Sequence, residues 1–192
     1  LAEHKTYIQS LPYMDRLDPV STVIGAVNTI RIIRNSAGIL LEGYNSDVYG
    51  FSESLKPLLK PHHRKALVLG TGGAAKAVVY TLNMLGLEWK MVSRTGKEGN
   101  TITYEQLNPQ IMEECNLIVN TTPLGTFPDT NAFPPVPFEW VTSRHLLYDL
   151  VYNPAETRFL ALGKEQGADV KNGYEMLELQ ALKSYEIWNP AG

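Results

Sequence analysis

The stretch LVLGTGGAAKA constrains the fold more than any other part of this sequence. A short apolar run at 66–70 leads directly into three closely spaced glycines, and a run of helical character at 71–86 follows. Apolar runs of this length are typical of strands that are buried on both faces of a parallel sheet. A second strand is expected at 88–94, so the stretch predicts a βαβ unit with a glycine turn after its first strand.

The same alternation continues towards the end of the chain. Further elements are expected as strands at 116–120, 145–152 and 168–172 and as helices at 103–115, 154–167 and 173–188. Strands that are separated by helices form parallel sheets with helices on both faces. The sequence therefore predicts an α/β fold with a Rossmann-like doubly wound parallel sheet.

The residues before this sheet have a different pattern. Two alternating runs at 27–34 and 38–44 are joined by Asn, Ser and Ala, which predicts a β-hairpin. A helix is expected from Ser46, at its N-cap, to the vicinity of Pro61. The proline-rich stretch at 125–140 is expected to be a long ordered loop of the kind that lines sites.

Composition narrows the class of function. A formal net charge of −3 gives no electrostatic footprint for nucleic acid, and 44% hydrophobic residues are enough for a buried core. No window approaches the roughly 18 apolar residues of a membrane span, and no leader is recognised, so the default expectation is the cytoplasm. The one cysteine, Cys115, is interpreted as a packing residue. A small molecule is therefore the expected partner.

The glycine turn is interpreted as a phosphate-binding site. Gly70 permits the tight turn, Gly72 lets a pyrophosphate approach the backbone, and Gly73 or Ala74 lets the helix lie close to the strand. The free N–H groups of the helix N-terminus favour an anion there. The alternative is a tight strand–helix turn without any ligand.

The end of the second strand indicates which dinucleotide would bind. A carboxylate at this point is typical of NAD sites, whereas here Ser93, Arg94 and Thr95 follow the strand. The guanidinium of Arg94 suits a 2′-phosphate, so NADP is favoured over NAD. Alternatively, Arg94 is a solvated surface charge.

Asp47 lies in the polar stretch GYNSDVYG, at the junction between the hairpin and its following helix. It can serve as the acidic residue of a catalytic site, or it can simply occupy the first turn of a helix, where a negative charge is favourable.

Seven stretches, taken in order, resemble the shikimate dehydrogenase (shikimate/quinate dehydrogenase) family: IGAVNTI, GYNSDVYG, LGTGGAAKA, SRT, VNTTPLG, YDLVYNP and NGYEMLELQA. The resemblance covers nearly the whole chain. It implies reversible, NADP-dependent reduction of 3-dehydroshikimate to shikimate by a two-domain enzyme with the substrate in the cleft. Residues 1–46 would then be the remnant of the substrate-binding domain, 47–172 the NADP-binding domain, and 173–192 a C-terminal helix that returns to the substrate domain.

The resemblance also implies roles for individual residues. The catalytic pair would be Asp47 and a lysine, and the substrate would contact Asn28, Asp47, Tyr152 and Gln180. Cofactor contacts would come from Gly70, Gly72, Gly73, Ala74, Ser93, Arg94, Thr95, Thr121, Thr122, Leu124, Leu150, Gly173, Met176 and Leu177. Outside the resemblance, Asn28 could bond a turn, Gln180 could be solvated and Tyr152 could be a packed aromatic.

Two departures from the family pattern matter. The opening segment that carries a Ser-x-Ser pair is not found, and the lysine nearest to the expected position is Lys5, in LAEHKTY. We therefore expect the chain alone to bind NADPH but to turn shikimate over poorly. The alternatives are a quinate/shikimate dehydrogenase that uses NAD, a methylenetetrahydrofolate dehydrogenase-like enzyme, and a non-catalytic nucleotide-binding module. A homodimer is possible.

Overall fold

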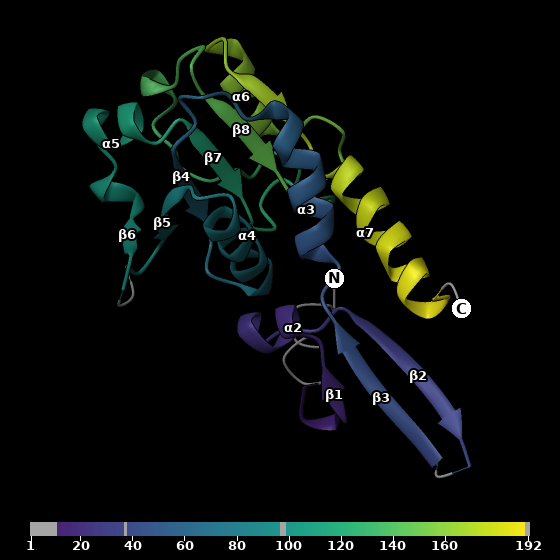
Figure 1. Cartoon of the computed structure of the whole chain (residues 1–192). Helices are drawn as coiled ribbons and strands as arrows, with labels where there is room; N and C mark the ends of the chain where they lie inside the picture. Colours follow the sequence, from purple (N-terminus) through teal and green to yellow (C-terminus); the bar gives the residue numbers. More distant parts are fainter. Residues whose placement is uncertain (1–10, 37, 97–98, 191–192) are drawn as a thin grey trace.

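The computed structural model describes residues 11–36, 38–96 and 99–190, which form two sheets (Figure 1). The smaller sheet has the order β1-β3-β2 and consists of β1 (Arg16–Leu17), β2 (Thr29–Asn35) and β3 (Gly38–Tyr44). The larger sheet has the order β6-β5-β4-β7-β8-β9 and consists of β4 (Lys65–Leu69), β5 (Glu88–Ser93), β6 (Thr101–Thr103), β7 (Leu117–Asn120), β8 (Leu146–Asp149) and β9 (Asp169–Lys171).

All neighbouring strands of the larger sheet pair in parallel. Its strand order reverses direction between β4 and β7, as in a doubly wound Rossmann sheet, so the predicted fold class is confirmed. In such sheets, ligands bind in the crevice outside the carboxyl ends of the strands at the point of reversal. The topology therefore places a candidate site next to the ends of β4 and β7.

Helices cover both faces of this sheet. Its strands alternate between two core clusters: Ala66 and Val68 of β4 lie in one, and Leu67 and Leu69 in the other. The first cluster also contains residues of α3 (Asp47–Leu55), α4 (Gly73–Met84) and α7 (Tyr174–Trp188). The second contains residues of α5 (Pro109–Glu114) and α6 (Arg158–Glu165). Both faces are thus buried, which explains the continuous apolar runs in the sequence.

The other elements are short. α2 (Pro19–Ile24) follows β1, and its N-cap Asp18 accepts a hydrogen bond from the Ser21 amide at 2.8 Å. Four single turns of 3₁₀ helix complete the described chain: η1 (Leu11–Tyr13), η2 (Lys56–Leu58), η3 (Tyr104–Gln106) and η4 (Phe138–Trp140). No helix within the described ranges combines the length and the apolar character that crossing a membrane requires.

One helix prediction was wrong. The segment 103–115 is not continuous, because β6 pairs with β5 through Thr103, η3 follows, and only Pro109–Glu114 form the helix α5. Asn108 accepts a hydrogen bond from the Ile111 amide at 3.0 Å and Pro109 occupies the first helical position, so a new helix starts there. The helix expected at 154–167 likewise starts only at Arg158, after the N-cap Thr157.

α7 packs along α3 and reaches the smaller sheet (Figure 1). A Cβ at Gly50 of α3 would lie 2.6 Å from the Met176 carbonyl oxygen of α7, so the two helices approach each other closely. Ser184 of α7 shares a hydrogen bond of 2.7 Å with Thr29 of β2, and the Trp188 indole donates one of 3.0 Å to the Ile30 carbonyl. The division of the chain at residues 46 and 172 remains a prediction.

Candidate active site

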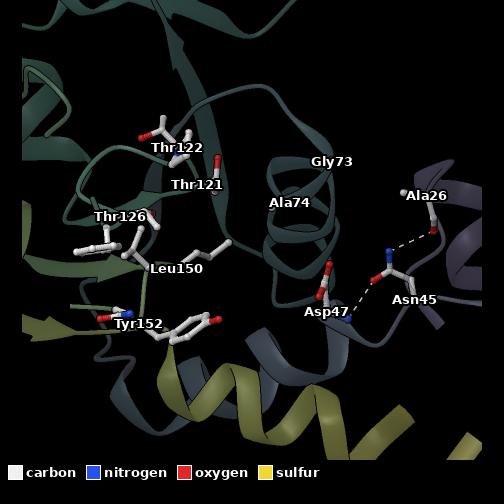
Figure 2. A pocket seen from close by; sticks show the side chains of 14 residues that line it. Ala26, Asn45, Asp47, Gly73, Ala74, Thr121, Thr122, Thr126, Leu150 and Tyr152 are labelled. Atoms are coloured by element: carbon white, nitrogen blue, oxygen red, sulfur yellow. Dashed lines mark hydrogen bonds between the residues drawn. The ribbon is translucent and has the colours of Figure 1, made fainter. Parts of the chain in front are cut away.

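A cavity of about 510 Å³ opens at the carboxyl ends of the central strands (Figure 2). Four groups of residues line it: the turn between α2 and β2, the start of α3 with the turn before it, the start of α4, and the loops after β7 and β8. They are Ala26, Asn45, Asp47, Gly73, Ala74, Thr121, Thr122, Pro123, Thr126, Phe127, Leu150, Val151, Tyr152 and Asn153. The cavity therefore lies where the strand order reverses.

The glycine turn shapes one side of this cavity. Gly70 has a φ of 108°, and a Cβ there would lie 2.8 Å from Oγ1 of Thr121. That hydroxyl donates a hydrogen bond of 2.7 Å to the Leu69 carbonyl oxygen and so joins the end of β4 to the loop after β7. Only glycine satisfies both the backbone conformation and the close contact.

The N-terminus of α4 is open to the cavity. Gly72 is the N-cap residue, and no atom lies within 4 Å of a Cβ built at Gly73. The space beside Gly73 is thus open, and the N-terminus of a helix carries the partial positive charge that favours phosphates. Ala75, the next residue of this helix but one, is 1% exposed and belongs to the first core cluster.

The end of β5 offers groups for the adenosine end of a dinucleotide. The Ser93 hydroxyl is buried and has no hydrogen-bond partner among the described residues. Such an orphaned group fits a ligand hydroxyl or phosphate oxygen. Arg94 and Thr95 follow on the exposed side of the strand end. Burial raises the pKa of Tyr104 to about 12, an effect that the charge of nearby Arg94 opposes. The residues present therefore fit a phosphorylated dinucleotide.

Asp47 begins α3 on the same side of the cavity as Gly73 and Ala74, with Leu150 and Tyr152 opposite (Figure 2). Asn45 holds the turn before it: its Oδ1 accepts hydrogen bonds from the amides of Asp47 at 3.1 Å and Val48 at 3.4 Å. The Asn45 amide nitrogen donates to the Ala26 carbonyl oxygen at 3.2 Å. Asp47 is thereby fixed at the cavity wall.

Ser46 lies at the N-cap position of α3, as expected, but it does not cap the helix with its side chain. The Ser46 hydroxyl instead lies among Asn28, Thr29 and Ser184, and the side chain that caps is that of Asn45. Lys5, the predicted partner of Asp47, lies outside the described residues.

The loops after β7 and β8 are joined behind the cavity wall. The buried carboxylate of Asp149 accepts hydrogen bonds from Asn120 Nδ2 at 2.9 Å, the Val151 amide at 3.0 Å and the Thr157 hydroxyl at 2.6 Å. Burial raises the pKa of Asp149 to about 6, and these three hydrogen bonds act in the opposite direction. Asn120 Oδ1 in turn accepts hydrogen bonds from Thr122, at 3.0 Å from its amide and 2.7 Å from its hydroxyl.

Several predicted site residues lie away from this cavity. The side-chain oxygen of Asn28 accepts a hydrogen bond of 2.8 Å from the Ser46 amide, which ties β2 to the start of α3. Gln180 is half-buried on α7. A Cβ at Gly173 would lie 2.1 Å from the Leu150 carbonyl oxygen, so this glycine permits the approach of α7 to the loop after β8. Also outside the lining are Gly70, Gly72, Ser93, Arg94, Thr95, Leu124, Met176 and Leu177.

Sequence reasoning missed Asn45, Asn120 and Asp149. Asn45 precedes Asp47 by two positions, which is the spacing of an Asx turn and was a usable signal. Asp149 ends an otherwise apolar strand, LLYD, and an acid in such a strand indicates a buried, bonded carboxylate. The link between Asn120 and Asp149 depends on strand register, for which the sequence holds no signal.

Metal ligands and the cysteine thiol also bear on the chemistry of the site. No cluster of three or more potential metal-ligating side chains is present in the described part of the chain. Cys115 is 2% exposed, and burial raises its pKa to about 11, so its predicted role as a packing residue is confirmed.

The sheet order, the glycine turn and the cavity beside it define a Rossmann-type dinucleotide-binding protein. No protein-family model matches the chain. It is 39% identical over 191 residues to a shikimate dehydrogenase (NADP(+)) of Carboxydothermus hydrogenoformans, covering 92% of this chain and 67% of that protein. It is 31% identical over 201 residues to the enzyme of that name from Methanosphaera stadtmanae, covering 96% and 69%. The chain belongs to the shikimate dehydrogenase family.

Solved structures agree with this assignment. A shikimate 5-dehydrogenase of Thermus thermophilus, in complex with NADP(H) and shikimate, is 33% identical with a TM-score of 0.80 and matches 96% of this chain. The match covers 70% of that chain. This chain thus spans about two thirds of the length of the relatives that it matches.

Proposed function

We propose that the chain takes part in the NADP-dependent, reversible reduction of 3-dehydroshikimate to shikimate. The observation that carries this proposal is that Asp47 and the open N-terminus of α4 line one cavity, at the point where the strand order reverses. A site for a dinucleotide phosphate and a carboxylate for substrate chemistry thus face the same space.

Residues of the larger sheet would hold NADP. The amides of Gly73 and Ala74 would bind the pyrophosphate, with Gly70 and Gly72 shaping the turn. Ser93, Arg94 and Thr95 would hold the adenosine end, where the guanidinium suits a 2′-phosphate. The nicotinamide end would lie beside Thr121, Thr122 and Leu150, with Leu124, Gly173, Met176 and Leu177 around it. The chemistry that a bound nicotinamide supplies is hydride transfer to or from the carbon that bears the oxygen.

The reduction also requires a proton at the ketone oxygen. We propose that Asp47 holds a lysine ammonium, assigned to Lys5, which donates this proton, while the carboxylate accepts a hydrogen bond from a neighbouring substrate hydroxyl. Tyr152 lies opposite, and we propose that it contacts the substrate together with Asn28 and Gln180. In the reverse direction the same pair takes the proton from the alcohol.

The proposal is tested by comparing Asp47→Asn with the unaltered chain. Asparagine keeps the size of the side chain and removes the charge that holds the proton donor, so we expect shikimate-dependent formation of NADPH to fall about 100-fold or more. The NADPH dissociation constant should stay within about twofold, because the phosphates bind at α4. Initial rates and fluorescence titration give the two quantities.

Glu53→Gln is the matched control. Glu53 lies on the same helix, faces solvent and pairs with Lys56 at 2.6 Å, so its substitution should leave both quantities unchanged. An undiminished rate in Asp47→Asn would refute the assigned role of Asp47. A chain that fails to bind NADPH at all would refute the proposed function.

The same assays separate the alternatives. Initial rates with shikimate and quinate, each with NADP and NAD, distinguish an NAD-dependent quinate enzyme, and binding without turnover supports a nucleotide-binding module. The prediction that these 192 residues turn over poorly would be contradicted by a rate equal to that of full-length relatives. A cytoplasmic location and a homodimer are further parts of the proposal, and light scattering in solution tests the latter.

A further inference from the structure

Two adjacent strands of the larger sheet end in polar residues that are fully buried. Asn120 ends β7 and Asp149 ends β8, and the two are register partners in the parallel ladder. Both are 0% exposed, and Thr157, which joins them from the start of α6, is 1% exposed. None of the three is among the residues that line the cavity. They form a second layer behind its wall.

Three described hydrogen bonds of this layer converge on the carboxylate of Asp149. Its Oδ1 accepts from Asn120 Nδ2 and the Val151 amide, and its Oδ2 accepts from the Thr157 hydroxyl. Asn120 extends the chain of bonds by accepting both hydrogen bonds from Thr122. The Asp149 side chain therefore bonds both loops of the cavity wall, one through Val151 and the other through Asn120 and Thr122.

Burying a charged carboxylate at this position costs free energy. Packing of the sheet does not require a charged side chain there. The neighbouring strand residues Leu146 and Leu147 show that apolar side chains fill this part of the sheet. A carboxylate here must be compensated by donors, and all three donors lie on the segments that form or support the cavity wall. Its removal would leave these donors buried without a partner and would remove the side-chain link between the two loops. In the described part of the chain, only backbone hydrogen bonds, from Leu150 to Asn120 at 3.0 Å and from Phe127 to Asn153 at 3.4 Å, would then join them.

We propose that Asp149 is a positioning residue that fixes the loops after β7 and β8 relative to each other, so that Thr122 and Leu150 hold the nicotinamide half of the dinucleotide. The inference rests on the proposed binding of NADP. It adds to the residues that line the cavity one buried residue that does not line it but hydrogen-bonds to the segments that do. Figure 2 shows that Thr122 and Leu150 lie on the same side of the cavity, apart from Gly73.

The test compares two ligands with the intact chain and its variants. NADPH requires both halves of the site, whereas adenosine 2′,5′-bisphosphate requires only the adenosine end at Ser93 and Arg94. Asp149→Ala should weaken NADPH binding about tenfold or more and change the affinity for the bisphosphate by about twofold at most. Asp149→Asn keeps an oxygen that can accept from Asn120 and Val151, so it should restore NADPH affinity to within about threefold of the unaltered chain.

Two further variants keep the test decisive. Asn120→Ala cuts the link from Asp149 to Thr122 but leaves the bonds to Val151 and Thr157, so it should show the same selective loss of NADPH affinity even where Asp149→Ala does not fold. Asp169→Asn is the matched control, because Asp169 lies on the adjacent strand β9 but is half-exposed and pairs with Lys60. It should bind both ligands as the unaltered chain does.

A merely structural role predicts a different pattern. If Asp149→Ala and Asn120→Ala weaken both ligands equally, or weaken neither, the inference is overturned while the proposed function stands. If the unaltered chain does not bind NADPH, the proposed function fails and the inference fails with it. A loss confined to NADPH, with recovery in Asp149→Asn, supports the inference.

Discussion

Replacing Asp149 by asparagine should change how the stability of the protein depends on pH. Burial raises the pKa of this carboxyl from its ordinary value of 3.8 to about 6 in the folded protein. Between these two values the folded state holds a proton that the unfolded chain has already released. Stability therefore falls as the pH rises through this window, and the full loss above it corresponds to about 3 kcal/mol.

Part of this loss in the free energy of unfolding falls within a pH range in which unfolding is readily measured. Linkage places about 1.4 kcal/mol of it between about pH 5 and pH 8, which for a chain of this size corresponds to a shift of roughly 3–6 °C in the unfolding midpoint. Asparagine cannot titrate, so the free energy of unfolding of Asp149→Asn should rise, relative to that of the unaltered chain, by this amount over the same range. Urea denaturation at the two pH values measures the difference.

Other titrating groups cancel in this comparison. Burial lowers the pKa of His63 and of His145, which gives a pH dependence of the opposite sign, but both histidines are present in both proteins. No charged side chain contributes to the shift of Asp149 among the described residues. Equal pH slopes for the two proteins would refute this reasoning, and a slope of the opposite sign would mean that the hydrogen bonds outweigh burial.

Three further predictions follow from single positions. Gly70→Ala should destabilise the fold by about 1–3 kcal/mol, measured by urea denaturation, because its Cβ would meet the Thr121 hydroxyl at 2.8 Å with φ at 108°. Arg94→Gln should weaken NADPH binding about tenfold or more and leave NADH binding nearly unchanged, as titration of both would show. Native Cys115, 2% exposed with its pKa raised to about 11, should react with a thiol reagent only when the chain unfolds.

The local parts of the fold could be predicted because their signals are local. The apolar strand, the glycines and the helix after them are adjacent in the chain, so LVLGTGGAAKA alone specifies the turn. Residues that the sequence indicated for the site also lie together, because one cavity is lined by Asp47, Gly73, Thr121, Leu150 and Tyr152. Their roles remain proposals.

What could not be predicted depends on distant contacts. The bond between Asn120 and Asp149 requires the register of two strands that are 29 positions apart, and no pattern within either strand specifies it. The prediction of one continuous helix at 103–115 was wrong for a local reason. Asn108 and Pro109 start a new helix within this segment, although its composition favours a single helix.

The close approach of Gly50 to the Met176 carbonyl has a consequence for substitutions at position 50. Because no side chain separates the two backbones, a side chain at position 50 would collide with the Met176 carbonyl oxygen and would crowd Gln180. The spacing between Asp47, at one end of α3, and Gln180, midway along α7, therefore depends on a glycine at position 50. A bulkier residue at position 50 would force the two helices apart and would thereby move Asp47, on the cavity wall, away from α7.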